Sequence, residues 1–256
     1  MDYFVSKASV VRSIWGKSDT ILFIFAGASA EFALNKAVDW LYFTGKLPQD
    51  PLGRLFSTVA YARNIVFSSV PDAHQAIDAM RKIHTAVEQS RGAVIPDWAY
   101  RDVLFMLIYY SIAAYELLEK PLMPEEKDEV YNVFYRVGLR MGLKELPPNY
   151  KAWLPVREKH LKDHLQQSSY TEDLFVQYRK HLGNFRYQVL LEAQKLVVPT
   201  LVKQLLGFTG VAWLGPVVPL YILSRYLYLD DVIKSVLLPK DYKAQIRAMD
   251  TWVGVS

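Results

Sequence analysis

Among the five histidines of the chain, His84 lies in the surroundings best suited to holding a metal ion. Ala73, Ile77, Met80 and Val87 stand at helical spacing from it and would form one apolar stripe that contains the imidazole. A neutral imidazole facing an apolar interior needs a partner for its lone pair, and a haem iron is one such partner. The other partner is a hydrogen bond within the core, and the residue pattern alone leaves both interpretations open.

A second polar group follows Asp50 and Pro51, which together are typical of a helix start. Arg54 and Thr58 are one turn apart on that helix and share a face, and Tyr61 follows one turn later. An arginine beside a hydroxyl on an otherwise apolar helix could donate hydrogen bonds to a haem propionate or to bound oxygen. The alternative is a surface arginine near a helix start.

Two further histidines, His160 and His164, are spaced to share one helix face, where they could hold a zinc ion. The zinc protease pattern also needs a glutamate directly after the first histidine, and Leu161 occupies that position. The neighbouring charges of Lys159 and Lys162 favour a solvated face instead. The sequence contains neither the Glu-x-x-His pairs of di-iron bundles nor a glycine-rich phosphate loop.

Helical periodicity dominates the chain, and no convincing alternating strand pattern or tight-hairpin dipeptide occurs. We predict helices at 4–15, 19–44, 50–68, 71–90, 97–119, 124–142, 150–166, 171–206 and 216–235. The second and eighth of these are expected to be interrupted. The uncharged segment 103–115 is too short to span a membrane, so we expect it to form the buried central helix of a single all-α bundle.

The composition fits one large domain rich in apolar residues. Hydrophobic residues make up 52% and aromatic residues 14% of the 256 positions, so apolar surface must enter a large core, a ligand pocket or a membrane contact. The 30 basic and 26 acidic residues are interspersed, which argues against nucleic-acid binding because that function needs a basic face. Without cysteine, a disulfide or a thiolate-ligated haem is impossible, and a cytoplasmic location is expected.

The segment 205–224 carries no charge and is about long enough to cross a bilayer. It also contains several glycines and prolines, which favour a buried helix–turn–helix over one spanning helix. We therefore keep peripheral contact with a membrane through 205–224 as the alternative location.

The order of these features resembles the MpaB/latex-clearing-protein (rubber oxygenase) family. The segments that carry the resemblance are Gly27–Ala33, Asp50–Arg54 with Thr58, Tyr61 and Phe67, Arg81–His84, and Ala113–Glu116 with Pro121 and Leu122. The resemblance is strongest over 20–145, and 146–256 would add C-terminal helices that complete a single domain 1–256. Leu237–Pro239 with Tyr242 forms a weaker match.

The resemblance implies a globin-like helical bundle that binds haem b, with His84 as the iron ligand. Arg54 and Thr58 would lie on the oxygen side of the haem and act in catalysis. Further cofactor contacts are expected from Tyr61, Met80 and Arg81. Family members of known activity add O₂ to apolar prenyl-type chains and cleave a carbon–carbon double bond, so we expect a haem-dependent oxygenase acting on an apolar alkene. A dry substrate pocket is expected along Val103, Met106, Leu107 and Tyr110.

The chain departs from the family pattern at several positions. It has Ala33-Leu34-Asn35 where members typically have Ala-His-Pro, and Ser57 where the rubber-cleaving members have lysine. Members often have a second histidine in the helix after the ligand helix, but no histidine lies between His84 and His160. The catalytic carboxylate of the family has no clear counterpart, since Glu31 and Asp39 are only nearby acids. Two alternatives therefore remain: a haem or lipid carrier without turnover, and a haem-free protein that contacts membrane surfaces.

Overall fold

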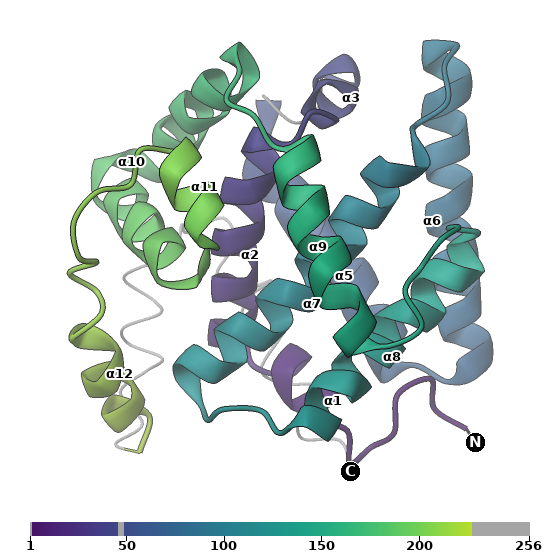
Figure 1. The fold of residues 1–256 in the computed structure, drawn as a ribbon, viewed down its shortest axis with the longest axis horizontal. Helices are drawn as coiled ribbons and strands as arrows, with labels where there is room; N and C mark the ends of the chain where they lie inside the picture. Colours follow the sequence, from purple (N-terminus) through teal and green to yellow (C-terminus); the bar gives the residue numbers. More distant parts are fainter. Residues whose placement is uncertain (1, 46–48, 227–256) are drawn as a thin grey trace.

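The computed structural model describes residues 2–45 and 49–226 (Figure 1). These ranges contain helices and connecting turns and no β-sheet, which confirms the all-α prediction. The helices are α1 (Val10–Trp15), α2 (Ser18–Leu34), α3 (Val38–Phe43), α5 (Pro51–Phe67), α6 (Val70–Arg91), α7 (Asp97–Leu118), α8 (Pro124–Met141), α9 (Tyr150–His164), α10 (Ser169–Val197), α11 (Thr200–Leu205) and α12 (Val217–Tyr226).

Local sequence explains where several helices begin. The Asp50 carboxylate accepts a hydrogen bond from the Gly53 backbone N–H at 2.8 Å and caps α5, as predicted. The Ser69 hydroxyl caps α6 in the same way. The first predicted helix starts too early, because residue 3 pairs with Ser69 in an isolated β-bridge and α1 begins only at Val10. Residues 227–256, which include the end of the last predicted helix and the weaker family match, lie outside the described residues.

Both predicted interruptions occur. Asn35 ends α2 in extended conformation, and its side-chain oxygen accepts a hydrogen bond from the Ala37 N–H at 2.8 Å. The long C-terminal helix stops at Val197 because Pro199 cannot continue it, and α11 follows. Within α10, Gly183 takes the left-handed φ of 72° and introduces a kink.

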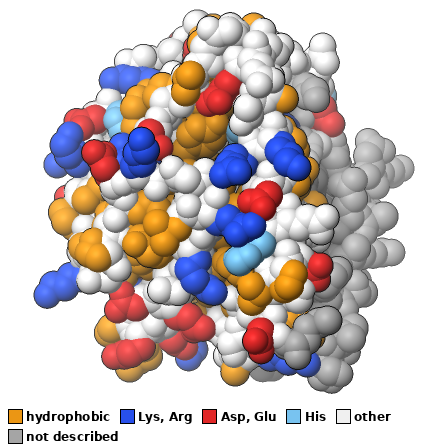
Figure 2. All heavy atoms as spheres, turned by 90° about the vertical axis from the view of Figure 1, so that its right-hand side faces the viewer, with side chains coloured by type: hydrophobic (Ala, Val, Ile, Leu, Met, Phe, Trp, Pro, Cys, Tyr) orange, Lys and Arg blue, Asp and Glu red, His pale blue; other side chains and the backbone are white. Residues whose placement is uncertain are grey.

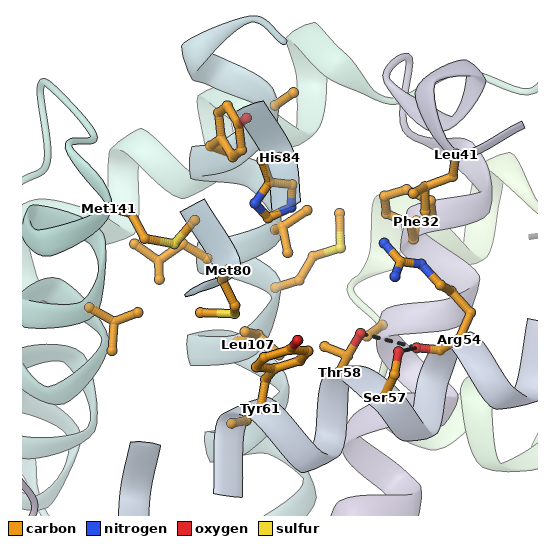
Figure 3. Close-up of a pocket in the computed structure, with 18 of the residues that line it drawn as sticks. Phe32, Leu41, Arg54, Ser57, Thr58, Tyr61, Met80, His84, Leu107 and Met141 are labelled. Carbon is orange, nitrogen blue, oxygen red and sulfur yellow. Dashed lines mark hydrogen bonds between the residues drawn. The ribbon is translucent and has the colours of Figure 1, made fainter. Parts of the chain in front are cut away.

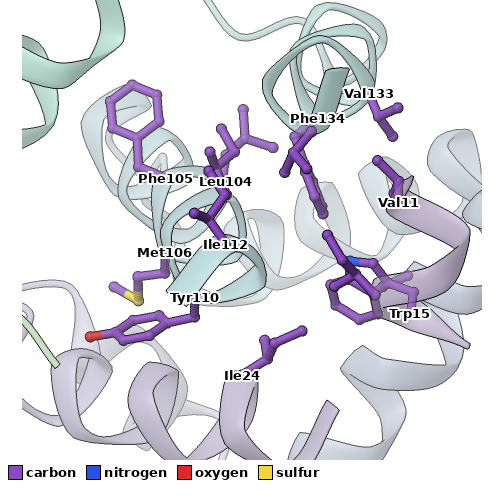
Figure 4. Packing of buried hydrophobic residues seen from close by; sticks show 14 of the residues in the cluster. Val11, Trp15, Ile24, Leu104, Phe105, Met106, Tyr110, Ile112, Val133 and Phe134 are labelled. Atoms are coloured by element: carbon purple, nitrogen blue, oxygen red, sulfur yellow. The ribbon is translucent and has the colours of Figure 1, made fainter. Parts of the chain in front are cut away.

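Helix α7 is the centre of the bundle and packs against α2, α8 and α10. Most of its apolar segment is buried, as expected, although Val103 at the start is 39% exposed. Figure 4 shows the adjoining layer, where the Trp15 and Phe134 rings lie 6.1 Å apart. Gly27 allows α2 to approach α7 closely, since a Cβ there would lie 2.2 Å from the Tyr110 ring.

The segment 205–224 contains the end of α11, several turns and most of α12. Some of its apolar side chains are solvent-exposed, among them Val211 and Leu220. Within the described residues, no helix combines the length and the apolarity needed to cross a bilayer. Membrane contact through 205–224 stays a prediction.

On the side of the molecule that carries α6, hydrophobic side chains lie among charges of both signs (Figure 2).

Candidate functional site

Helices α2, α5, α6, α7 and α8 surround a cavity of about 320 Å³ (Figure 3). Its walls are mostly aliphatic and aromatic side chains. The polar side chains on it are few, and they belong to Ser29, Arg54, Ser57, Thr58, Tyr61, His84, Tyr100 and Tyr178, together with the indole of Trp40. A cavity of this size and character suits an apolar small molecule held in place by a few polar contacts.

The His84 imidazole projects from α6 into this cavity (Figure 3). The Tyr100 ring packs edge-on against it, with 5.2 Å between the ring centroids, and limits its rotation. Its Nδ1 atom is buried, and its nearest acceptor is the Met80 carbonyl one helical turn earlier, a weak contact that does not satisfy it fully. The imidazole therefore lies in an apolar site with little hydrogen bonding from the described residues.

The pKa of His84 is lowered from its ordinary value. Burial is the main cause, and the positive charge of Arg54 adds to it. The Met80 carbonyl and the Glu88 carboxylate oppose the shift but do not reverse it. His84 is therefore neutral at physiological pH, which is the form that can bind a metal ion.

Helix α5 supplies the opposite wall, and its hydroxyl groups differ from the expectation. Ser57 Oγ donates to the Arg54 carbonyl at 2.8 Å, and Thr58 Oγ1 donates to the same oxygen at 3.2 Å (Figure 3). Both hydroxyl protons are thus already engaged, so these side chains offer lone pairs to a ligand rather than the hydrogen bond expected from Thr58. The Arg54 guanidinium is the strong donor on this wall.

The structure brings most of the predicted site residues to this one cavity. Besides Arg54, Thr58 and His84, they are Tyr61, Met80, Val103, Met106 and Leu107. Arg81 and Tyr110 are not among the lining residues. The Arg81 side chain is exposed on another face of α6. The Tyr110 ring is fully buried, and its hydroxyl donates to Glu31 at 2.8 Å.

Neither acid that was considered for catalysis lines the cavity. Glu31 is buried in an ion pair with Arg157, with 2.5 Å between carboxylate oxygen and guanidinium nitrogen. Asp39 pairs with Arg91 at 2.7 Å. Among the described residues, no aspartate or glutamate lines the cavity, so its walls offer no carboxylate base.

A separate cluster joins Asp102 of α7 to His160 and His164 of α9. The Nδ1 atom of His160 lies 2.5 Å from one carboxylate oxygen, and that of His164 lies 2.9 Å from the other. The solvated face predicted for His160 is wrong, because this residue is only 9% exposed. Asp102 was not predicted as a member of any polar cluster. The one signal in the sequence was its position as an acid inside an otherwise apolar helix.

The cluster is already satisfied by protein groups. Asn35 Nδ2 also donates to Asp102, at 2.8 Å, so three nitrogens surround one carboxylate and join α2, α7 and α9. The rings of Trp98 and Phe105 pack against the two histidines. No member of the cluster lines the cavity. These contacts favour a structural role.

The fold and the cavity define an all-helical protein in which a neutral imidazole lines an apolar cavity. Over residues 16–219 the chain matches the family described as "ER-bound oxygenase mpaB/B'/Rubber oxygenase, catalytic domain". The matched segment is most of the chain, so the chain belongs to this family and is an oxygenase, an enzyme that uses O₂ and an organic substrate. Comparisons with curated proteins and with solved structures gave no match.

Proposed function

We propose that this oxygenase depends on haem b and uses O₂ to oxidise an apolar alkene, with His84 as the iron ligand. The observation that carries the proposal is the neutral His84 imidazole, which projects into an apolar cavity (Figure 3). His84 is the one histidine among the described residues that line this cavity.

The residues present fit this cofactor. Aliphatic and aromatic walls suit the face of a porphyrin, and the neutral His84 imidazole on the same walls can hold its iron. When bound, haem supplies a site where O₂ binds and is activated, and an imidazole ligand gives less push toward O–O cleavage than a thiolate.

The side chains of the cavity define what the protein itself contributes. Val103, Met106 and Leu107 exclude water from the alkene. Because the described walls hold no carboxylate, proton removal from the substrate by an acid side chain is disfavoured. This arrangement supports direct addition of oxygen to an electron-rich double bond.

A second candidate deserves comparison because two histidines and one carboxylate are also the ligand set of non-haem iron oxygenases. The ligand atoms of Asp102, His160 and His164 lie within 4.8 Å of one another. The Asp102 carboxylate, however, already accepts hydrogen bonds from three side chains, and neither it nor the two histidines line the cavity of His84. These facts favour haem at His84 over iron at Asp102.

Oxygen uptake tests the proposal. The full chain, expressed with excess haem, is incubated with isotopically labelled O₂ and a panel of prenyl alkenes, and products are identified by mass. We expect labelled carbonyl or epoxide products from wild type, and none from His84→Ala. The control is His181→Ala, an exposed histidine outside the cavity. Turnover that persists in His84→Ala, or that is lost only in Asp102→Asn, would contradict it. Haem binding without any turnover would favour a carrier.

A further inference from the structure

The Arg54 guanidinium is a cation for which the described residues supply no anion. Within the described residues it takes part in no salt bridge, and no protein acceptor receives a hydrogen bond from it. Burial lowers the pKa of Arg54, and the one opposing contribution comes from the Tyr61 side chain. The folded protein therefore carries an uncompensated charge on the wall of an apolar cavity.

Other partly buried arginines of the chain show how the protein normally satisfies this group. Arg157 pairs with Glu31, and Arg225 pairs with Asp19 and Glu119; the pKa of each arginine is raised.

Two arginines that lack an acidic partner still donate to backbone oxygens. The Arg12 side chain donates to the Val5 carbonyl at 3.0 Å, and the Arg136 side chain donates to the Phe4 carbonyl at 2.9 Å. In the described ranges Arg54 has neither kind of partner, although its side chain reaches into the cavity (Figure 3). This contrast indicates that a ligand supplies its acceptor.

The surroundings restrict the chemistry of that ligand. Arg54 is the one permanently charged side chain among the described lining residues, so a group with a single negative charge suits it better than a dianionic phosphate. The neighbouring Ser57 and Thr58 hydroxyls already donate elsewhere and cannot supply the further donors that a phosphate needs. A carboxylate matches the planar guanidinium in shape and charge. The remaining walls call for an aliphatic tail.

We propose that the substrate is a long-chain unsaturated carboxylic acid whose carboxylate pairs with Arg54. Its tail lies along the apolar walls formed by α6 and α7, past His84. The proposal rests on the proposed function for the oxidation itself. The binding step stands on the cavity and on Arg54 alone.

Ligand titration tests the binding step without turnover. Palmitoleic acid, methyl palmitoleate and palmitoleyl alcohol are titrated under anaerobic conditions into the full chain, in both haem-free and haem-loaded forms. The acid is expected to bind roughly tenfold to a hundredfold more tightly than the neutral analogues, because a charge-assisted hydrogen bond adds about that much affinity. Arg54→Met should remove this preference and leave alcohol binding unchanged, while Arg54→Lys should keep part of it.

The matched control is Arg179→Met, which removes an exposed arginine outside the cavity and should change nothing. Equal binding of acid, ester and alcohol by wild type would overturn the inference, as would no binding of the acid. So would a preference that survives Arg54→Met, or equal weakening of all three ligands in that variant.

Haem also carries carboxylates, and the two forms of the protein separate this source from the substrate. If Arg54→Met loses haem while acid binding by the haem-free chain is unchanged, Arg54 serves the porphyrin and the inference fails. If the acid preference depends on Arg54 but no form of the chain binds haem, the proposed function fails and the ligand assignment stands.

Discussion

The Arg54 guanidinium and the His84 imidazole face the same cavity from α5 and α6, where burial and then the arginine charge lower the pKa of the imidazole (Figure 3). The described cavity walls contain no carboxylate that would neutralise the arginine. His84 therefore offers a neutral imidazole that can bind a metal ion, and Arg54 offers a cation that can bind an anion. The predictions below follow from this pair and from the contacts that support it.

The depressed pKa of His84 makes the stability of the haem-free protein depend on pH. The unfolded chain binds a proton near pH 6.5 and the folded chain only at lower pH, so acidification through this range favours unfolding. Wild type should lose stability below about pH 6.5, and His84→Gln should lose less. Urea titrations at several pH values measure this. If the free energy of unfolding changed with pH in the same way in both proteins, the pKa of His84 would be the same in the folded and unfolded chain, and the prediction would be wrong.

The buried ion pair between Glu31 and Arg157 should be sensitive to loss of one partner. Arg157→Met leaves the Glu31 carboxylate buried without its cation, and we expect the free energy of unfolding to fall by about 3–5 kcal/mol. The double variant Glu31→Gln/Arg157→Met should recover part of this loss. Lys159→Met, which breaks an exposed pair with Asp163, is the control and should leave the free energy of unfolding nearly unchanged. Denaturant unfolding compares all three.

The Asp102 cluster should act on stability and not on metal content. Asp102→Asn removes the charge that three side-chain nitrogens share, so we expect a loss of about 1.5–3 kcal/mol. Iron per chain, measured by elemental analysis after haem loading, should stay unchanged. Loss of iron in this variant with retention in His84→Ala would assign the metal to α7 and α9 instead.

The close contact between α2 and α7 gives a test of the core. Gly27→Ala places a methyl group on the Tyr110 ring, and we expect a loss of about 1–3 kcal/mol from overpacking. Thermal unfolding measures the change. A variant as stable as wild type would mean that the two helices pack less tightly than described.

The fold could be predicted because its signals are local. Asp50 with Pro51, and the Gly92 that ends α6 at a φ of 67°, set helix ends through the chain next to them. The residues of the site could be predicted from the sequence only in part. Helical spacing relates His84 to Met80, but not His84 to Arg54 across two helices. The Asp102 cluster depends on contacts between residues 35, 102, 160 and 164, and one helix face reveals only the last two.

Local sequence patterns also could not show that Arg81 and Tyr110, which were predicted site residues, do not line the cavity. Tyr110 belongs to the apolar central helix as Met106 does, and only the packing of α2 decides that it contacts Glu31 and not the cavity. Arg81 adjoins Met80 in sequence but projects from another face of α6, because successive residues of a helix point about 100° apart.

Haem titration of His84→Ala, followed by absorption spectroscopy with and without added imidazole, tests the central claim most directly. Wild type should bind one haem per chain with a Soret band typical of imidazole ligation. The variant should lose that spectrum and regain it when free imidazole enters the cavity. An unchanged spectrum in His84→Ala, or wild-type protein that stays colourless with excess haemin, would contradict the assignment of His84 as the iron ligand.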